Sequence, residues 1–163
     1  MQPNSPLSQF LPYRLSITSN AVSGRIAQEY RAHFGLSVPE WRVMAVLGDS
    51  GGVTQRELTS LTLMDKVAVN RACKVLEERM LAKRSPNTLD GRSHLLELTE
   101  EGLAMHGQIM PLAQEMEKRI FAGLDPAEKA QFSDLLARVL AQIGDLEEDF
   151  QSGGFGVADH SNT

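Results

Sequence analysis

The sequence predicts a mainly α-helical protein with one small β-hairpin, and two observations lead to this fold class. Over most of the 163-residue chain, apolar residues recur at three- and four-residue steps, which is the period of amphipathic helices. After Leu81 the period changes, and two short segments, 82–85 and 94–98, flank a turn that contains Asp90-Gly91. A chain of this length corresponds to one domain, or to one domain with an oligomerisation extension.

Composition excludes several classes of protein. The single cysteine, Cys73, cannot form an intramolecular disulfide, so nothing points to an oxidising compartment. No apolar run is long enough to span a bilayer, and the N-terminal residues lack the charged and apolar blocks of a signal peptide. We therefore expect a cytoplasmic protein that has no membrane partner.

The N-terminal half predicts an arm followed by capped helices. Residues 1–10 contain two prolines and several polar residues, and we expect a loose, flexible arm there. The apolar spacing predicts a helix over 11–34, which Gly35 ends. Capping boxes over Ser37–Glu40 and Thr54–Glu57 each predict the start of a further helix.

A third capped helix follows and leads into the hairpin. Asp65 is the expected N-cap of a helix that runs to about Met80. The core stripe of this helix is predicted to consist of Val69, Ala72, Leu76 and Met80. The two predicted strands come directly after it.

Two longer helices are expected in the C-terminal half. The first begins with Thr99-Glu100-Glu101, whose acids suit the positive end of the helix dipole, and is expected to bend at Gly107 and Pro111. The second begins at Asp125, with Pro at the first helical position and Glu at the third. Its apolar residues are spaced 4-3-4-3-4, which predicts a seam for a partner helix formed by Phe132, Leu136, Val139, Ile143, Leu146 and Phe150. Residues 151–163 are rich in Gly and Ser, and we expect a disordered tail.

Positive charge is concentrated in the middle of an acidic chain. Between Arg56 and His94 there are eight Lys and Arg against five Asp and Glu, whereas the whole chain carries a net charge of −5. A compact basic region on an acidic body is the electrostatic footprint of a protein that binds a polyanion. The order helix, short helix, helix and basic hairpin is that of a winged helix-turn-helix, whose third helix fits the major groove of double-stranded DNA.

The candidate DNA-binding residues lie on the third helix, at the start of the short helix before it, and on the hairpin. Asn70 can make a bidentate contact with adenine and Arg71 with guanine, while Arg92 at the hairpin tip is expected to reach a flanking minor groove, with Asp90 bracing its guanidinium. Val67 can touch a thymine methyl group, and Lys66 and Lys74 are placed to meet phosphates. The full set is Thr54, Gln55, Lys66, Val67, Asn70, Arg71, Lys74, Arg84, Arg92 and His94, and His94 is expected at a phosphate.

Four segments of the chain form a distinctive set: Asp65-Lys66-Val67-Ala68-Val69-Asn70-Arg71, Leu76-Glu77 before Leu81, Asp90-Gly91-Arg92, and Leu96-Glu97-Leu98-Thr99-Glu100-Glu101-Gly102. Through these segments the chain resembles the multiple-antibiotic-resistance regulator (MarR) family of bacterial transcription factors, over roughly residues 11–150. The resemblance implies a homodimer that binds a pseudo-palindromic operator and usually represses until a small ligand releases it. By position, Asn70, Arg71 and Arg92 match the family's base and groove contacts.

The resemblance also implies how the chain is divided. The winged helix-turn-helix domain would be residues 37–98, and the helices of residues 11–36 and 99–150 would form the dimerisation region. This chain has Asn70 where the family often has Ser, and Met80 where Gly is common before the wing.

An effector pocket is a further implication of the resemblance. Family members with effectors often bind them between the dimerisation helices and the winged domain, which implies a pocket lined by the first helix and the helix that begins near Ser37. The candidate residues are Tyr13, Arg14, Ile17, His33, Trp41 and Arg42. An aromatic wall with a guanidinium suits a phenolic or carboxylated aromatic compound. The same pattern also fits Tyr13 and Trp41 as core residues and Arg14 as a solvated one.

Other chemistry finds little support. The histidines at 33, 94, 106 and 160 lack the spacing of metal ligands, so we expect no metal and no other cofactor. The chain has no phosphate-binding Gly loop, nucleophile motif or convincing pair of carboxylates, so we do not expect an enzyme. Cys73 lies near the core stripe, where a small buried hydrophobe is expected rather than an oxidant sensor.

The sequence therefore predicts a homodimeric DNA-binding transcription regulator, most simply a repressor that responds to a small molecule. Three alternatives stay open. The winged fold could serve as a protein-interaction module without reading DNA, the chain could be an enzyme, or it could bind DNA without any ligand.

Overall fold

A computed structural model describes residues 6–151 of the chain, and its side chains over residues 6–146. Residues 1–5 of the expected arm and the expected tail beyond Gln151 lie outside the described residues. The chain forms two compact units, an N-terminal unit up to Glu117 and a C-terminal unit from Lys118 onward.

The N-terminal unit begins with two helices. Residues 6–9 form the short helix α1 (Pro6–Gln9), which differs from the loose arm expected there. Helix α2 (Leu11–Phe34) has the predicted bounds and ends at Gly35, which adopts the left-handed conformation with φ 65°. The amide of Gly35 donates to the carbonyl oxygen of Arg31 at 3.0 Å, so this residue closes the helix as predicted.

Three further helices start at the predicted caps. In α3 (Val38–Ser50) the amide of Ser37 donates to the Glu40 carboxylate at 2.9 Å. In α4 (Gln55–Thr62) the Thr54 amide donates to Glu57 at 2.7 Å, and the Glu57 amide donates back to the Thr54 hydroxyl at 3.2 Å. In α5 (Lys66–Glu78) Asp65 accepts the amide of Ala68 at 2.8 Å. These starts are confirmed because short-range side-chain bonds satisfy the first amides of each helix.

The end of α5 corrects one prediction. The helix stops at Glu78, and the chain turns through Met80, which is left-handed with φ 59°. The amide of Leu81 donates to the carbonyl of Leu76 at 2.8 Å, and that of Met80 to Glu77 at 2.9 Å, which is a Schellman closure. Met80 is 71% exposed, so assigning it to the core stripe was wrong; the left-handed turn carries its side chain out of the helical row.

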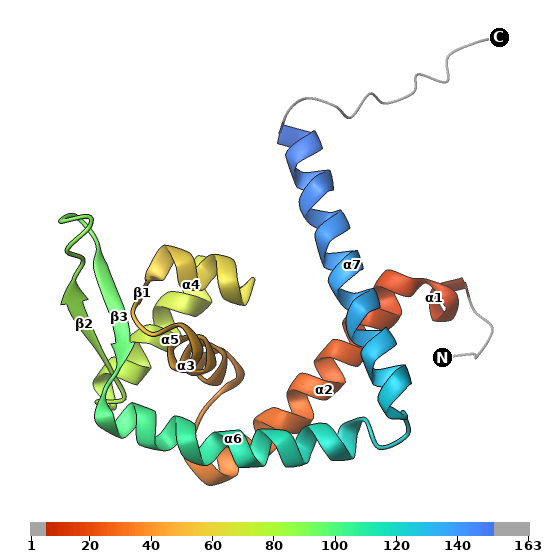
Figure 1. The fold of residues 1–163 in the computed structure, drawn as a ribbon, viewed down its shortest axis with the longest axis horizontal. Helices are drawn as coiled ribbons and strands as arrows, with labels where there is room; N and C mark the ends of the chain where they lie inside the picture. The colour runs from red at the N-terminus through yellow and green to blue at the C-terminus, as the bar shows by residue number, and fades with distance from the viewer. Residues whose placement is uncertain (1–5, 152–163) are drawn as a thin grey trace. The chain divides into compact units, whose positions relative to one another are not determined.

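A small sheet follows α5 (Figure 1). Strands β2 (Ala82–Pro86) and β3 (His94–Leu98) pair antiparallel, with Ala82 opposite Leu98, which confirms the hairpin. Strand β1 (Val53–Thr54) adds a third member that the sequence did not predict, since two residues carry no alternating pattern. The order in the sheet is β1-β3-β2.

One hydrophobic core holds the helices and the sheet of the N-terminal unit together. Helix α6 (Glu100–Ile120) follows β3 and continues through Pro111. Within the N-terminal unit, the hairpin tip lies on the side away from α6 (Figure 1). The core draws on α2, α3, α4, α5, the sheet and α6; its fully buried large side chains are Leu36, Val43, Met44, Leu47, Leu58, Val69, Cys73 and Leu76.

The C-terminal unit consists mainly of α7 (Pro126–Gln151). Its predicted start is confirmed, because Asp125 and Glu128 exchange amide-to-carboxylate bonds of 2.9 Å each. The apolar seam of this helix is 39–51% exposed over Phe132, Leu136, Val139, Ile143 and Leu146. The side chain of Phe150 lies outside the described residues. Along the part of the chain that the structure describes, no helix is long and apolar enough to cross a membrane.

A close backbone approach makes Gly102 the most sensitive glycine of α6. A Cβ added there would overlap the carbonyl oxygen of Leu81, whereas one added at Gly107 would meet nothing within 4 Å. We expect Gly102→Ala to lower the free energy of unfolding by about 1–3 kcal/mol. Gly107→Ala, the matched control in the same helix, should raise it by roughly 0.5–1 kcal/mol. Urea titrations of both variants test this, and equal midpoints would contradict it.

Candidate DNA-binding surface

Helix α5 has one buried face and one exposed face. Its buried residues Val69, Ala72, Cys73 and Leu76 are at most 2% exposed, and the helix packs against α3. Its opposite face carries five exposed residues that the sequence predicted as DNA contacts: Lys66, Val67, Asn70, Arg71 and Lys74. The helical period separates the two sets, so the fold leaves the predicted reading face free of packing.

The start of α4 adjoins this face. Gln55, the first residue of α4, donates from Nε2 to Oδ1 of Asn70 at 3.2 Å. The hydroxyl of Thr54 donates to Glu57 at 2.8 Å and accepts the Glu57 amide, so this side chain serves as the helix cap. The backbone amide of Thr54 and, second, its hydroxyl donate to the Glu57 carboxylate, and these two bonds lower the pKa of Glu57 below its ordinary value. Of the two residues predicted here, Gln55 is the one turned toward α5.

Local bonds shape the hairpin tip. The amide of Asn87 donates to the carbonyl of Ser93 at 3.1 Å, and Asp90 accepts the backbone amide of Arg92 at 3.2 Å. Asp90 therefore holds the backbone of the turn. The sequence analysis expected its carboxylate to brace the Arg92 guanidinium, but the described residues contain no ion pair between the two groups. Arg92 is exposed, and Leu89 is 98% exposed. The sequence analysis did not single out Leu89 as a residue of the exposed wing tip. The signal was its position as a lone apolar residue among the polar residues of a turn.

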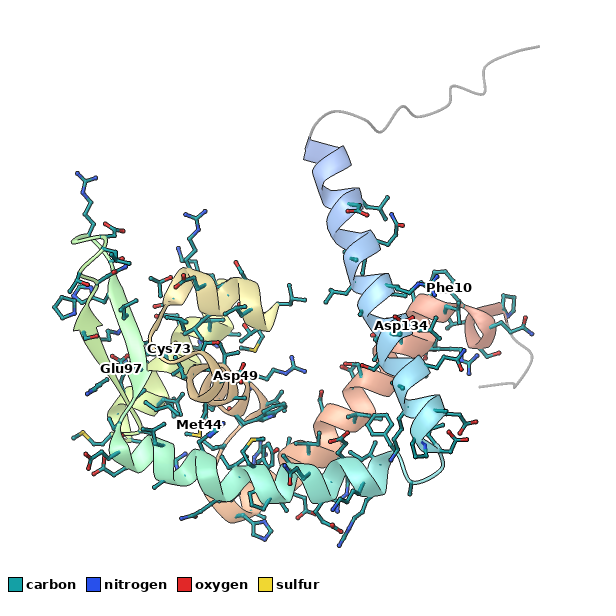
Figure 2. The ribbon with its side chains drawn as sticks, viewed as in Figure 1. Phe10, Met44, Asp49, Cys73, Glu97 and Asp134 are labelled. Atoms are coloured by element: carbon teal, nitrogen blue, oxygen red, sulfur yellow. The ribbon has the colours of Figure 1, made fainter. Side chains whose placement is uncertain are left out.

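Two cations of the wing are engaged within the protein. Arg84 on β2 donates to Glu77 on α5 at 2.7 Å, and this bond raises the pKa of the arginine. Lys83 pairs with Glu97 across the strands at 3.3 Å, and Figure 2 shows Glu97 on β3. Arg84, which the sequence predicted as a DNA contact, thereby links β2 of the wing to α5. The predicted residue His94 is exposed at the start of β3.

Arg79 is a connecting residue that the sequence did not single out. Its guanidinium donates to the carbonyl oxygens of Phe34 at 2.8 Å and Gly35 at 3.0 Å. The end of α5 is thereby tied to the end of α2, whose last carbonyls would otherwise lack partners. Because Arg79 lies more than forty residues from Phe34 and Gly35, the sequence does not predict these bonds. The one available signal is the presence of a basic residue directly after α5.

The six predicted ligand residues do not gather in one place. Tyr13, Arg14 and Ile17 lie in the first turns of α2, whereas His33 is near its end. Twenty residues of helix separate Tyr13 from His33, which corresponds to roughly 30 Å. His33 is exposed and bonds the carbonyl of Glu29 at 2.9 Å.

Trp41 and Arg42 mark the junction of α2 with α3. The indole ring meets the Tyr30 ring edge to face at 5.4 Å between centroids. Arg42 donates to the hydroxyl of Ser23 at 3.1 Å. The indole Nε1 of Trp41 is buried without a hydrogen-bond partner in the described part of the chain. An orphan buried donor of this kind is uncommon, and a bound molecule could satisfy it.

Cys73 is enclosed in the N-terminal unit (Figure 2). Its side chain is 0% exposed, and burial raises the pKa of the thiol to about 11. The thiol is therefore protonated at neutral pH and has little nucleophilic character. Among the described residues, no group of three or more His, Cys, Asp or Glu is placed to hold a metal ion; His160 lies outside them.

Comparison with known sequences points to one family. A profile of the MarR family matches residues 34–93, from the end of α2 to the wing tip. The chain is 30% identical over 116 residues to the HTH-type transcriptional regulator YwoH of Bacillus subtilis, covering 71% of this chain and 84% of YwoH. It is 28% identical over 97 residues to the HTH-type transcriptional repressor NicR of Pseudomonas putida, covering 60% of this chain. The aligned region spans 61% of the length of NicR.

Solved structures share the fold. A MarR/EmrR family regulator from Acinetobacter sp. ADP1 superposes with a TM-score of 0.80 at 24% identity, covering 86% of this chain and 99% of that one. Bordetella bronchiseptica BpsR, whose DNA binding is regulated by 6-hydroxynicotinic acid, superposes with a TM-score of 0.66 at 23% identity, covering 77% and 98%. These likenesses confirm the predicted winged helix-turn-helix.

The environment of Cys73 predicts a thiol that reacts only when the chain unfolds. At pH 8 a thiol of pKa about 11 is almost fully protonated, and burial blocks access as well. We expect Ellman's reagent to label the native protein very slowly and the denatured protein within minutes, with Cys73→Ala as the blank. Fast labelling in native buffer would contradict the buried role and favour oxidant sensing.

Proposed function

Because this chain belongs to the MarR family of transcriptional regulators, we propose that it binds a pseudo-palindromic DNA operator as a homodimer and represses transcription. In each half-site α5 enters the major groove and the wing tip reaches a flanking minor groove. The observation that carries this proposal is the exposed face of α5, which carries three cations (Lys66, Arg71 and Lys74) and the amide of Asn70 and lies on the same unit as Arg92.

The chemistry of the side chains assigns their roles. Arg71 and Asn70 carry the donors that read base edges in the major groove. Lys66 and Lys74 supply charge to phosphates, although Lys74 lies 3.7 Å from Glu78. Arg92 suits the enhanced negative potential of a narrow minor groove. Arg84 is assigned to holding the wing and not to DNA.

Dimerisation is assigned to the seam of α7. A helix with an apolar stripe at heptad spacing is stabilised when a partner helix covers it, and this stripe is about half exposed in the single chain. A second copy is the partner that the family membership supports. A two-fold dimer meets a two-fold operator, so the half-sites should lie about 10 bp apart.

The proposed function includes release by a small aromatic acid. Trp41 offers an unsatisfied indole donor beside the Tyr30 ring, and Arg42 on the same helix offers a guanidinium for a carboxylate. The named effector of BpsR, 6-hydroxynicotinic acid, belongs to this chemical class. Such a ligand changes operator affinity only if it binds one separation of the two recognition helices better than another.

Removal of the reading arginines tests DNA binding. We expect Arg71→Ala and Arg92→Ala each to weaken binding to a selected operator by at least about tenfold, because each deletes a groove contact. Arg25→Ala, which removes an arginine paired with Glu29 on α2, is the matched control and should bind like the wild type. Fluorescence anisotropy over a salt series measures the affinities, and the wild type should weaken steeply as salt rises. If both variants match the wild type, the assigned surface is wrong.

Charges placed on the seam of α7 test dimerisation. The double change Val139→Glu, Ile143→Glu puts two carboxylates into the predicted interface, where burial without partners is costly. We expect a monomer in sedimentation velocity, with strongly reduced operator affinity. Ala141→Glu, on the opposite face of the helix, is the control and should stay dimeric. A dimer that persists in the double variant would place the interface elsewhere.

A further inference from the structure

The side chains of Gln55 and Asn70 form an amide pair on the exposed face of the helix-turn-helix. Gln55 Nε2 donates to Asn70 Oδ1 at 3.2 Å, from the first turn of α4 to the second turn of α5. In the described part of the chain, neither side chain makes another hydrogen bond. The pair therefore presents its remaining donors and acceptors outward, on the surface assigned to DNA.

The bond restricts what Asn70 can offer to a base. A free carboxamide presents an acceptor oxygen and a donor NH₂ group, and together they match the N6 and N7 edge of adenine. Here Oδ1 is directed at Gln55 and one of its two lone pairs is used, so the NH₂ group points away from Gln55. Asn70 keeps one free lone pair on Oδ1 but offers both hydrogens of its NH₂ group, which biases it toward base edges that present acceptors.

Both ends of the bond are fixed to rigid elements. Thr54 and Glu57 close the first turn of α4 around Gln55, and Asp65 caps the start of α5. Because the backbone at each end is already ordered, the only conformational entropy lost in holding the two amides together is that of the two side chains. The groove beside Gln55, about 470 Å³, is also lined by Arg56 and Lys66, two cations suited to backbone phosphates.

We propose that Gln55 sets the base preference of the recognition helix by holding the Asn70 carboxamide with its NH₂ group toward the DNA. The proposal rests on the proposed function. Asn70 is the contact and Gln55 the positioning residue. The base pair facing Asn70 should present guanine O6 and N7 or thymine O4, in preference to cytosine, whose major-groove edge is a donor.

Two variants of Gln55 separate this proposal from a merely structural role. Gln55→Met keeps the length of the side chain but cannot donate, so Oδ1 of Asn70 is no longer held at residue 55 and can accept from a base. The frequency of adenine at the base pair that faces Asn70 should then rise about tenfold. Gln55→Glu can only accept, so it draws the Asn70 NH₂ group toward itself and turns Oδ1 to the groove. The preference should then move to bases that donate, which are cytosine and adenine. Binding to a randomised duplex library followed by sequencing gives these preferences directly.

Controls separate base choice from charge and folding. Gln108→Glu makes the same change of charge on the exposed side of α6 and should leave the preferences unchanged. In an Asn70→Ala background, Gln55→Glu should no longer alter them, because its effect passes through Asn70. Thermal melts followed by circular dichroism verify that each variant folds.

The outcomes are distinct. A change of base preference at one position, lost in the Asn70→Ala background, supports the proposal. Wild-type preferences retained by both Gln55 variants would overturn it while leaving operator binding intact. A wild-type protein that selects no sequence at all would instead overturn the proposed function, and this inference with it.

Discussion

The carbonyl group of Leu81 is where three parts of the N-terminal unit meet. It accepts the amide of Thr99 at 3.1 Å, which joins the start of β2 to the end of β3, and the backbone of Gly102 lies directly against it. The Thr99 hydroxyl donates to the carbonyl of Met80 at 2.6 Å and accepts the amide of Gly102 at 3.0 Å. Helix α5, the wing and α6 thus share one junction, which is held by the backbone of Leu81 and Thr99 and by the Thr99 hydroxyl. This explains physically why the segment Leu98-Thr99-Glu100-Glu101-Gly102 is distinctive in the sequence.

Some basic residues of the central region are bonded within the protein, and others are left unpaired on the surface proposed to bind DNA. Arg79 caps α2 and Arg84 binds Glu77, so both hold elements of the N-terminal unit to α5. Lys66, Arg71 and Arg92 have no ion pair among the described residues. The net charge of the sequence counts all of these residues equally. Only the structure separates the cations that hold helices and strands together from the cations that are free on the surface.

The sequence predicted what local interactions determine. The capping boxes at Thr54 and Asp125 are satisfied within four residues, so the helix starts could be read directly. Strand β1 exists only because it pairs with β3, and the Arg79 cap joins residues more than forty positions apart, so neither leaves a local pattern. The reading face of α5 was predictable from helical period, but the Gln55 bond that orients Asn70 was not, because it depends on how α4 and α5 pack.

The links around the end of α2 also constrain how an effector could act. Arg79 ties the last carbonyls of α2 to α5, and the Tyr30 ring joins α2 to Trp41 on α3. A ligand bound beside Trp41 therefore meets a part of the protein in which the end of α2, α3 and the recognition helix are bonded together. Because close-packed elements move as bodies and do not deform continuously, such a ligand would act by selecting a position of this whole assembly. The distance between the two recognition helices of a dimer would change, while the reading face of each would keep its shape.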